Sequence, residues 1–218
     1  MRVVLAVLWK DLASEWRARD RVVAMTVFGL LVVTAFHFAL PPRSMEANAA
    51  GLLWVAFVFT ALLGLNRTFA QELENDALSG LALAPADRGF VFLGKALATF
   101  VLTSVVEAIT TLAFAVVFGQ DWLGVAAPLA GVVALATAGL CSVGVLFSAM
   151  AVRTRFREVL LPVLLLPALL PVLAAAVRGT AAVLAGEPLP LEALQLLIVI
   201  DGVYLVASFL GFEYVLDE

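Results

Sequence analysis

The chain has 218 residues, of which 64% are hydrophobic and 14% are charged, with a formal net charge of −4. Soluble domains hold about 45–50% apolar and about 25% charged residues, whereas the mean hydropathy here is +1.10. These values exclude an ordinary soluble domain and predict one membrane domain over residues 1–218. A single cysteine, Cys141, excludes an intrachain disulfide, and no Cys/His cluster in the sequence indicates a bound metal.

Residues 1–21 precede the first long apolar run and are expected to form an amphipathic helix. Leucine and tryptophan recur there at three- and four-residue spacing, with charged residues between them: Leu5, Leu8, Trp9, Leu12 and Trp16. Tryptophan favours the membrane interface and arginine favours lipid phosphates, so we expect this helix to lie along the inner surface. A plain anchor and a positioning role both fit. We favour positioning, because a chain with six spans needs no further anchor.

A helix needs about 20 apolar residues to cross a hydrocarbon core of about 30 Å. Six runs meet this need: residues 22–40, 49–66, 90–118, 122–151, 159–177 and 193–212. The predicted fold class is therefore an all-α integral membrane protein with six transmembrane helices. The fourth run has small residues at every fourth position, expected to pack within the chain: Ala126, Ala130, Ala134, Ala138 and Ser142. Three prolines in the fifth run fit either a bent core helix or a hinge.

The basic residues predict the orientation of the chain. All but two of the 13 Lys and Arg residues fall in the N-terminal segment and in the connections after the second and fourth runs. Only Arg43 and Arg178 fall on the other side. Because basic residues remain on the cytoplasmic side, both termini and the connection 67–89 are predicted to be cytoplasmic. On this assignment no Lys or Arg lies inside a span.

Two acidic residues lie inside predicted spans, Glu107 in the third and Asp201 in the sixth. A charge at the centre of a bilayer costs about 2.5–3.5 kcal/mol even on a lenient scale, so both are expected to face the protein interior, at similar depth. Polar residues extend both sites along their helices: Thr99, Thr103 and Thr111 near the first, Tyr204 and Ser208 near the second. Two interpretations stay open. The acids line a substrate path or a proton-linked site, or they form a structural hydrogen-bonded pair, protonated by burial.

A near match to the phosphate-binding pattern G-x-x-x-x-G-K-[ST] occurs at residues 89–96, which read GFVFLGKA. We reject a nucleotide site, because Ala96 replaces the hydroxyl that would hold Mg²⁺, no strand precedes the pattern and a membrane span follows it. No catalytic spacing appears in the water-exposed segments, so the chain is not expected to be an enzyme. His37, near the outer end of the first span, is a candidate haem contact because haem iron binds imidazole. A structural interfacial histidine is the alternative.

The connection 67–89 interrupts the apolar sequence with acidic residues followed by leucines. The residues expected to form a partner-binding helix are Glu72, Leu73, Glu74, Asp76, Leu78 and Leu81, and Pro85 ends it. The order of these residues, with LSGLALAPADR after the acids, resembles the coupling helix of type-2 ABC exporter permeases. Asp76-Ala77 stands where that family commonly has Asp/Glu-Gly.

Three further stretches narrow the resemblance: LLWVAFVFTALLGLNRTF, RTRFREVLLPVLLLPALLPVL and LIVIDGVYLVASFLGFEYVLDE. Together they resemble the permease of the cytochrome c maturation ABC transporter, the haem exporter protein B family. The resemblance implies a type-2 ABC permease fold in the bacterial inner membrane. It also implies a homodimer that works with two copies of an ABC ATPase and with a periplasmic haem chaperone. Two further membrane proteins would belong to the same complex, one that handles haem and one that is small.

The same resemblance implies how the chain acts. ATP would bind the partner ATPase, and its hydrolysis would release the haem-loaded chaperone, with no cofactor bound directly to this chain. No nucleic-acid partner is expected. The alternatives are that the chain itself exports haem, or that it is a type-2 exporter of another hydrophobic substrate. We favour the transducer, because the predicted spans contain acidic residues and no basic ones.

Overall fold

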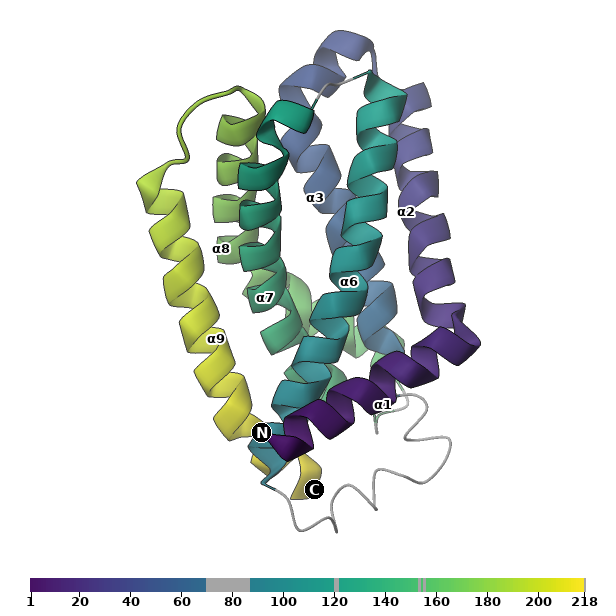
Figure 1. Cartoon of the computed structure of the whole chain (residues 1–218), viewed down its shortest axis with the longest axis vertical. Helices are drawn as coiled ribbons and strands as arrows, with labels where there is room; N and C mark the ends of the chain where they lie inside the picture. The colour runs from purple at the N-terminus through teal and green to yellow at the C-terminus, as the bar shows by residue number, and fades with distance from the viewer. Residues whose placement is uncertain (70–86, 120–121, 153, 155, 218) are drawn as a thin grey trace.

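The computed structural model describes residues 1–69, 87–119, 122–152, 154 and 156–217, and within these residues all regular structure is helical (Figure 1). Six of the helices are long and apolar enough to cross a membrane, which confirms the predicted all-α class with six candidate spans. The elements are α1 (Arg2–Ala18), α2 (Asp20–Ala39), α3 (Pro42–Asn66), α6 (Arg88–Phe118), the 3₁₀ turn η1 (Leu123–Val125), α7 (Ala126–Ala151), α8 (Arg157–Leu184) and α9 (Leu191–Asp217).

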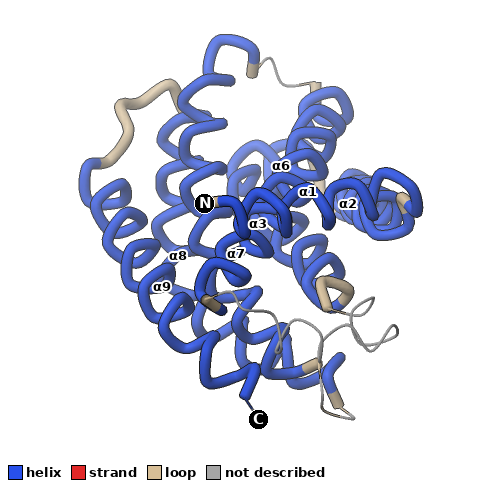
Figure 2. The backbone as a smooth tube through the Cα atoms, turned by 60° about the horizontal axis from the view of Figure 1, so that its bottom comes forward, coloured by secondary structure: helices blue, strands red, loops and turns tan. Residues whose placement is uncertain are grey.

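The six long helices run side by side along the long axis of the molecule, and α1 lies obliquely across one end of them (Figure 1). Both chain termini lie at this end, which we call the termini end; the other is the far end. α1 packs against α6, and α7 packs against α6, α8 and α9. In Figure 2 the termini end comes forward and α1 crosses in front of the bundle. The arrangement gives α7 a central place between the helices that carry the two acidic residues.

The corner between α1 and α2 is built by Glu15 and Arg19. Arg19 adopts a left-handed backbone conformation with φ of 58°, so α1 ends at Ala18 and not at residue 21. Glu15 Oε1 accepts hydrogen bonds from the backbone N–H groups of Arg21 (3.1 Å) and Val22 (3.0 Å). A carboxylate at these N–H groups satisfies donors that the first turn of α2 leaves without helical partners. The corner thereby turns the chain from the interfacial helix into the first span.

Helix limits depart from the predicted runs at several ends. α3 begins at Pro42 instead of residue 49, and α9 continues to Asp217 instead of residue 212. α8 continues to Leu184, beyond the predicted limit of 177, and holds its three prolines inside one helix. Arg178 therefore lies within α8, although its side chain is exposed. α7 begins at Ala126 instead of 122, because η1 occupies the preceding residues. α6 begins at Arg88, where the Asp87 carboxylate accepts a hydrogen bond from Gly89 N–H at 2.9 Å.

Buried apolar side chains gather in two clusters, one toward each end of the bundle. The cluster near the termini end includes Leu65, Phe92 and Phe212, and the cluster near the far end includes Trp54 and Phe114. The expectation that the small residues of α7 pack within the chain is only half correct. Ser142 is buried and Ala138 is half-buried, whereas the members nearer the far end are exposed: Ala126, Ala130 and Ala134.

Candidate functional site

Glu107 is buried at mid-bundle, with an exposed fraction of 1%. The Thr137 hydroxyl on α7 lies 2.9 Å from Glu107 Oε1 and 2.8 Å from Oε2, so it donates to the carboxylate. Thr103 and Thr99, about one and two turns before Glu107 on α6, are also buried. The Thr111 hydroxyl donates instead to the Glu107 backbone carbonyl at 2.7 Å. A polar strip of α6 is thus turned into the protein, as its spacing predicted.

Asp201 points from α9 toward α7. Its two carboxylate oxygens are buried, and neither has a hydrogen-bond partner among the described residues. Oδ1 occupies the space that a Cβ atom at Gly139 would fill. Only glycine at this position therefore leaves room for the carboxylate beside α7. Tyr204, almost one turn further along α9, donates its hydroxyl to the backbone carbonyl of Ala168 on α8.

The two carboxylates lie at similar depth but on opposite sides of α7. Their contacts on that helix, Thr137 and Gly139, are two positions apart, which is about 3 Å along the axis and about 200° around it. Glu107 and Asp201 therefore do not form the hydrogen-bonded pair that was one interpretation of the sequence. Whether either acid has a functional role stays a prediction.

A second polar site, which the sequence did not predict, lies at the termini end around Lys95. This lysine is within α6 and only 1% exposed, so the expectation that no basic residue lies inside a span is wrong. Its ammonium lies 3.1 Å from Asp11 Oδ2 on α1 and donates to the Thr68 backbone carbonyl at 3.3 Å. It also lies 4.9 Å from the centroid of the Phe69 ring.

The α1–α2 corner reaches the same site. Arg21 Nε lies 3.4 Å from Glu15 Oε2, and both side chains are largely buried. Arg21 Nη1 lies within 3.4 Å of the Thr68 hydroxyl. Thr68 thus contacts two cations: its side-chain hydroxyl lies at the Arg21 guanidinium of α2, and its backbone carbonyl accepts from the Lys95 ammonium of α6. The only sequence signal for this site was a lysine placed two turns into an apolar helix.

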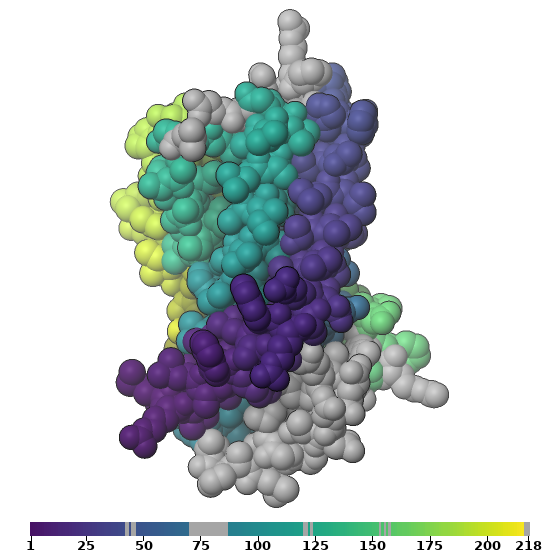
Figure 3. Space-filling view, turned by 45° about the vertical axis from the view of Figure 1, so that its right-hand side comes forward, coloured from purple at the N-terminus to yellow at the C-terminus, as the bar shows by residue number. Residues whose placement is uncertain are grey.

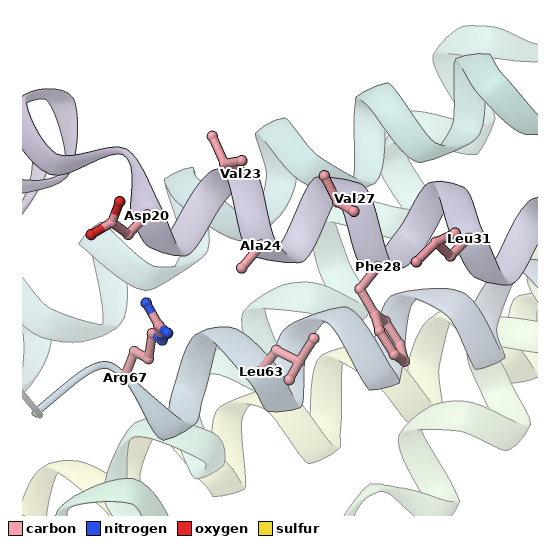
Figure 4. A pocket seen from close by; sticks show the side chains of 8 residues that line it. All are labelled: Asp20, Val23, Ala24, Val27, Phe28, Leu31, Leu63 and Arg67. Carbon is pink, nitrogen blue, oxygen red and sulfur yellow. The ribbon is translucent and has the colours of Figure 1, made fainter.

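A shallow groove of about 580 Å³ separates α2 from the end of α3 (Figure 4). Its lining is mostly apolar, with one carboxylate and one guanidinium at the end nearer α1: Asp20, Val23, Ala24, Val27, Phe28, Leu31, Leu63 and Arg67. Figure 4 shows Arg67 directed from the end of α3 toward Asp20 at the start of α2. The groove is therefore an open, mostly apolar surface with an oppositely charged pair of side chains at one end.

Comparison with known proteins identifies the family. The family described as CcmB protein matches residues 2–212, almost the whole chain. The chain belongs to the CcmB family. With its six apolar helices, it is therefore a multi-pass bacterial membrane protein.

Curated CcmB relatives cover most of the chain. "Heme exporter protein B" of Rhodobacter capsulatus is 33% identical over 77% of this chain and 78% of its own length. The protein of the same name from Paracoccus denitrificans is 33% identical over 81% of this chain and 83% of its own. The protein of the same name from Pseudomonas aeruginosa is 27% identical over 74% of this chain and 73% of its own length. The predicted resemblance is therefore confirmed.

Two predicted sites of this CcmB-family chain lie away from the buried acids. His37, in the last turn of α2, is exposed, and its ring lies 5.4 Å from that of Phe38 and 5.7 Å from that of Phe118. Among the described residues no group of three or more metal-ligating side chains exists. The predicted coupling residues, from Glu72 to Leu81, lie outside the described residues.

Proposed function

We propose that this chain is the membrane permease component of a haem-exporting ABC complex for cytochrome c maturation. The single observation that carries the proposal is the CcmB match over residues 2–212. The curated relatives bear the name "Heme exporter protein B" and cover most of the chain. The bundle supports the role of a membrane component, and ATP would bind to a separate ATPase.

In the finer form of the proposal, the chain converts ATP hydrolysis into release of the haem-loaded periplasmic chaperone. The contact with the ATPase would be made by residues 70–84, where an acidic and leucine-rich sequence interrupts the apolar spans. The termini end supports this role, because buried ion pairs tie α1, α2 and α6 to Thr68, at the point where the chain leaves α3 for this segment.

Charge reversal in the predicted coupling segment tests this form. Glu74→Lys should abolish ATP-driven chaperone release by the purified complex, while insertion and folding of the permease are unchanged. Glu187→Lys is the matched control, because Glu187 is an exposed acid at the far end of the bundle. Wild-type release by the Glu74→Lys complex would refute the coupling role of the segment.

The second candidate function is haem transport by this chain itself, and the α2–α3 groove favours it. Haem is a flat apolar molecule with two carboxylates, and the groove pairs an apolar wall with one guanidinium, that of Arg67, which faces the Asp20 carboxylate. The buried acids give less support, since they lie on opposite sides of α7 and form no single path. Liposomes that contain the complex and receive haem only on the chaperone side separate the two functions. Loading and ATP-driven release there would show that this chain need not carry haem.

The proposed complex contains two copies of this chain. Single cysteines in a Cys141→Ala background test which helices meet, at Val27 on α2, Val163 on α8 and Ala130 on α7, all of which are exposed in one chain. We expect crosslinked dimers from the first two. The exposed small residues of α7 make that helix the competing interface. Efficient crosslinks at Ala130, without crosslinks at Val27 or Val163, would show that α7 and not α2 and α8 forms the dimer interface.

The proposed orientation places the termini end in the cytoplasm. Basic residues concentrate in the segments that meet at this end, as the positive-inside rule requires. A membrane-impermeant thiol reagent added to intact spheroplasts should label Glu187→Cys at the far end. It should not label Trp16→Cys on α1, which is exposed in the chain. The opposite pattern would invert the orientation.

A further inference from the structure

The residues that resembled a nucleotide-binding loop, 89–96, form instead the place where α6 meets three other elements. Gly89 faces the Phe209 ring of α9 so closely that a Cβ atom would overlap it. A Cβ atom at Gly94 would lie 2.6 Å from Val7 Cβ and 2.9 Å from the Val4 backbone oxygen of α1. Contacts this short leave no space for a side chain, so the two glycines let α9 and α1 approach the α6 backbone.

Lys95 follows directly after the second of these glycines and joins α1 to the end of α3. Its ammonium is paired with Asp11 on α1 and donates to the Thr68 carbonyl, beyond the last turn of α3. In Figure 3, α1 (dark purple) lies across the base of α6, against which it packs. Because a backbone carbonyl is held as well as a side chain, the position of the α3 end is fixed relative to α1.

Phe69 extends this junction to α9. Its ring is 2% exposed, lies under the Lys95 ammonium and is 6.2 Å from the ring of Phe212. Phe92 of α6 contacts the same Phe212 ring at 5.6 Å. The last residue described before the proposed coupling segment is therefore packed between a cation and an aromatic cluster.

A buried ion pair is a poor source of stability, because loss of hydration offsets the attraction between the charges. Apolar side chains of similar size often stabilise a protein equally well or better. A buried polar or charged group can instead fix the register of two elements, a role best established for coiled coils. The contacts of Lys95 therefore favour a role in holding elements at fixed relative positions.

We infer that Lys95, with Asp11, is a positioning residue that links the end of α3 to the interfacial helix α1, so that displacement of one displaces the other. The inference rests on the proposed function, because the displacement would come from the ATPase through the segment after Phe69. It assigns α1 a role in transmission in addition to membrane attachment.

The experiment uses the purified complex of this chain with its ATPase, with spin labels at Trp9→Cys on α1 and Phe59→Cys on α3. Both positions are exposed, and the background carries Cys141→Ala. The test variants are Lys95→Met and the milder Asp11→Asn, which keeps an acceptor oxygen. Lys10→Met is the matched control, because Lys10 pairs with the same Asp11 at 3.2 Å from a half-exposed position.

We expect a narrow distance distribution in the background and in the Lys10→Met complex, and a broad one in both test variants. Chaperone release per ATP hydrolysed should fall by about five-fold or more in the test variants only, measured at a temperature at which every complex stays folded and assembled. Unchanged distances in Asp11→Asn and Lys95→Met, or an equal loss in Lys10→Met, would overturn the inference. Broader spin-label distance distributions together with full chaperone release would show that the junction is only structural. That result would also overturn the inference.

Failure of the proposed function would appear differently, as a wild-type complex without ATP-driven release. The label distance, with and without ATP, then tests the link directly. An ATP-dependent shift that disappears in Asp11→Asn would support the inference. Absence of any shift in the wild-type background would overturn it.

Discussion

Lys95 and Glu107 are two buried ionisable residues on one helix, about 18 Å apart along α6. Both are 1% exposed, but their surroundings differ. The lysine at the termini end meets a carboxylate, a backbone carbonyl and an aromatic ring from two other parts of the chain. The glutamate at mid-bundle meets one threonine hydroxyl on the neighbouring helix.

The difference follows from where each residue lies in the bundle. At the end of the helices, chain segments turn and expose carbonyls, and α1 adds an acid, so an ion can be matched by several groups. At mid-bundle most backbone groups are used within the helices, and the Glu107 carboxylate finds its partner in a side chain. The lysine therefore holds several elements together, whereas the glutamate joins two helices. Substitutions at the two positions should differ accordingly.

The largest effect is expected from Lys95→Ala. Removal of one member of a buried ion pair costs about 3–5 kcal/mol. Asp11 keeps Lys10 as a partner, but the Thr68 carbonyl loses its donor and a cavity forms beside the Phe69 ring. The free energy of unfolding, measured by steric trapping in lipid nanodiscs, should fall by that amount. Lys10→Ala, which removes the half-exposed partner of the same Asp11, should have little effect. Equal effects at the two lysines would mean that burial of Lys95 does not matter.

A slightly smaller loss is expected from Gly94→Ala. The added methyl group would meet the backbone of α1, which cannot move aside without separating from α6. Such overpacking costs about 1–3 kcal/mol. Gly51→Ala is the control, because nothing lies within 4 Å of a Cβ atom there. Proteolysis of α1 in the folded complex should become faster only in the Gly94 variant, and unchanged proteolysis would contradict the close contact.

At mid-bundle, Thr137→Val and Glu107→Gln should separate the hydrogen bond from the charge. Valine leaves the Glu107 carboxylate without its donor, which costs about 1–3 kcal/mol. Glutamine keeps an acceptor oxygen for Thr137, so we expect a change in the free energy of unfolding below about 1 kcal/mol. If Glu107→Gln also leaves cytochrome c maturation unchanged, Glu107 is a structural residue and the comparison with Lys95 concerns packing alone.

The smallest effect on stability is expected from Asp201→Asn. No described residue donates to the Asp201 carboxylate, so asparagine of nearly the same size loses no hydrogen bond. We expect thermal unfolding within the error of the wild-type value. A loss of maturation activity at unchanged stability would identify a functional acid, whereas a large loss of stability would reveal a partner of Asp201 in the assembled complex.

Much of the architecture was set by local sequence. Six apolar runs of bilayer length determined six long helices, because each such helix satisfies its own backbone hydrogen bonds. The spacing of leucine and tryptophan likewise determined α1. Helix ends were less predictable, because they depend on single contacts. Residues 1–21 read as one amphipathic stretch, yet the carboxylate of Glu15 and the left-handed Arg19 end α1 at Ala18.

Tertiary structure decided which polar residues meet. The sequence showed that Glu107 and Asp201 must avoid lipid, since each lies deep within an apolar helix. It did not show that Thr137 and Gly139 place them on opposite sides of α7, because helix rotation depends on packing. Nor did it distinguish Lys95 from the basic residues of the connections. Its burial follows only from the approach of α1 to Gly94, a contact between residues far apart in the chain.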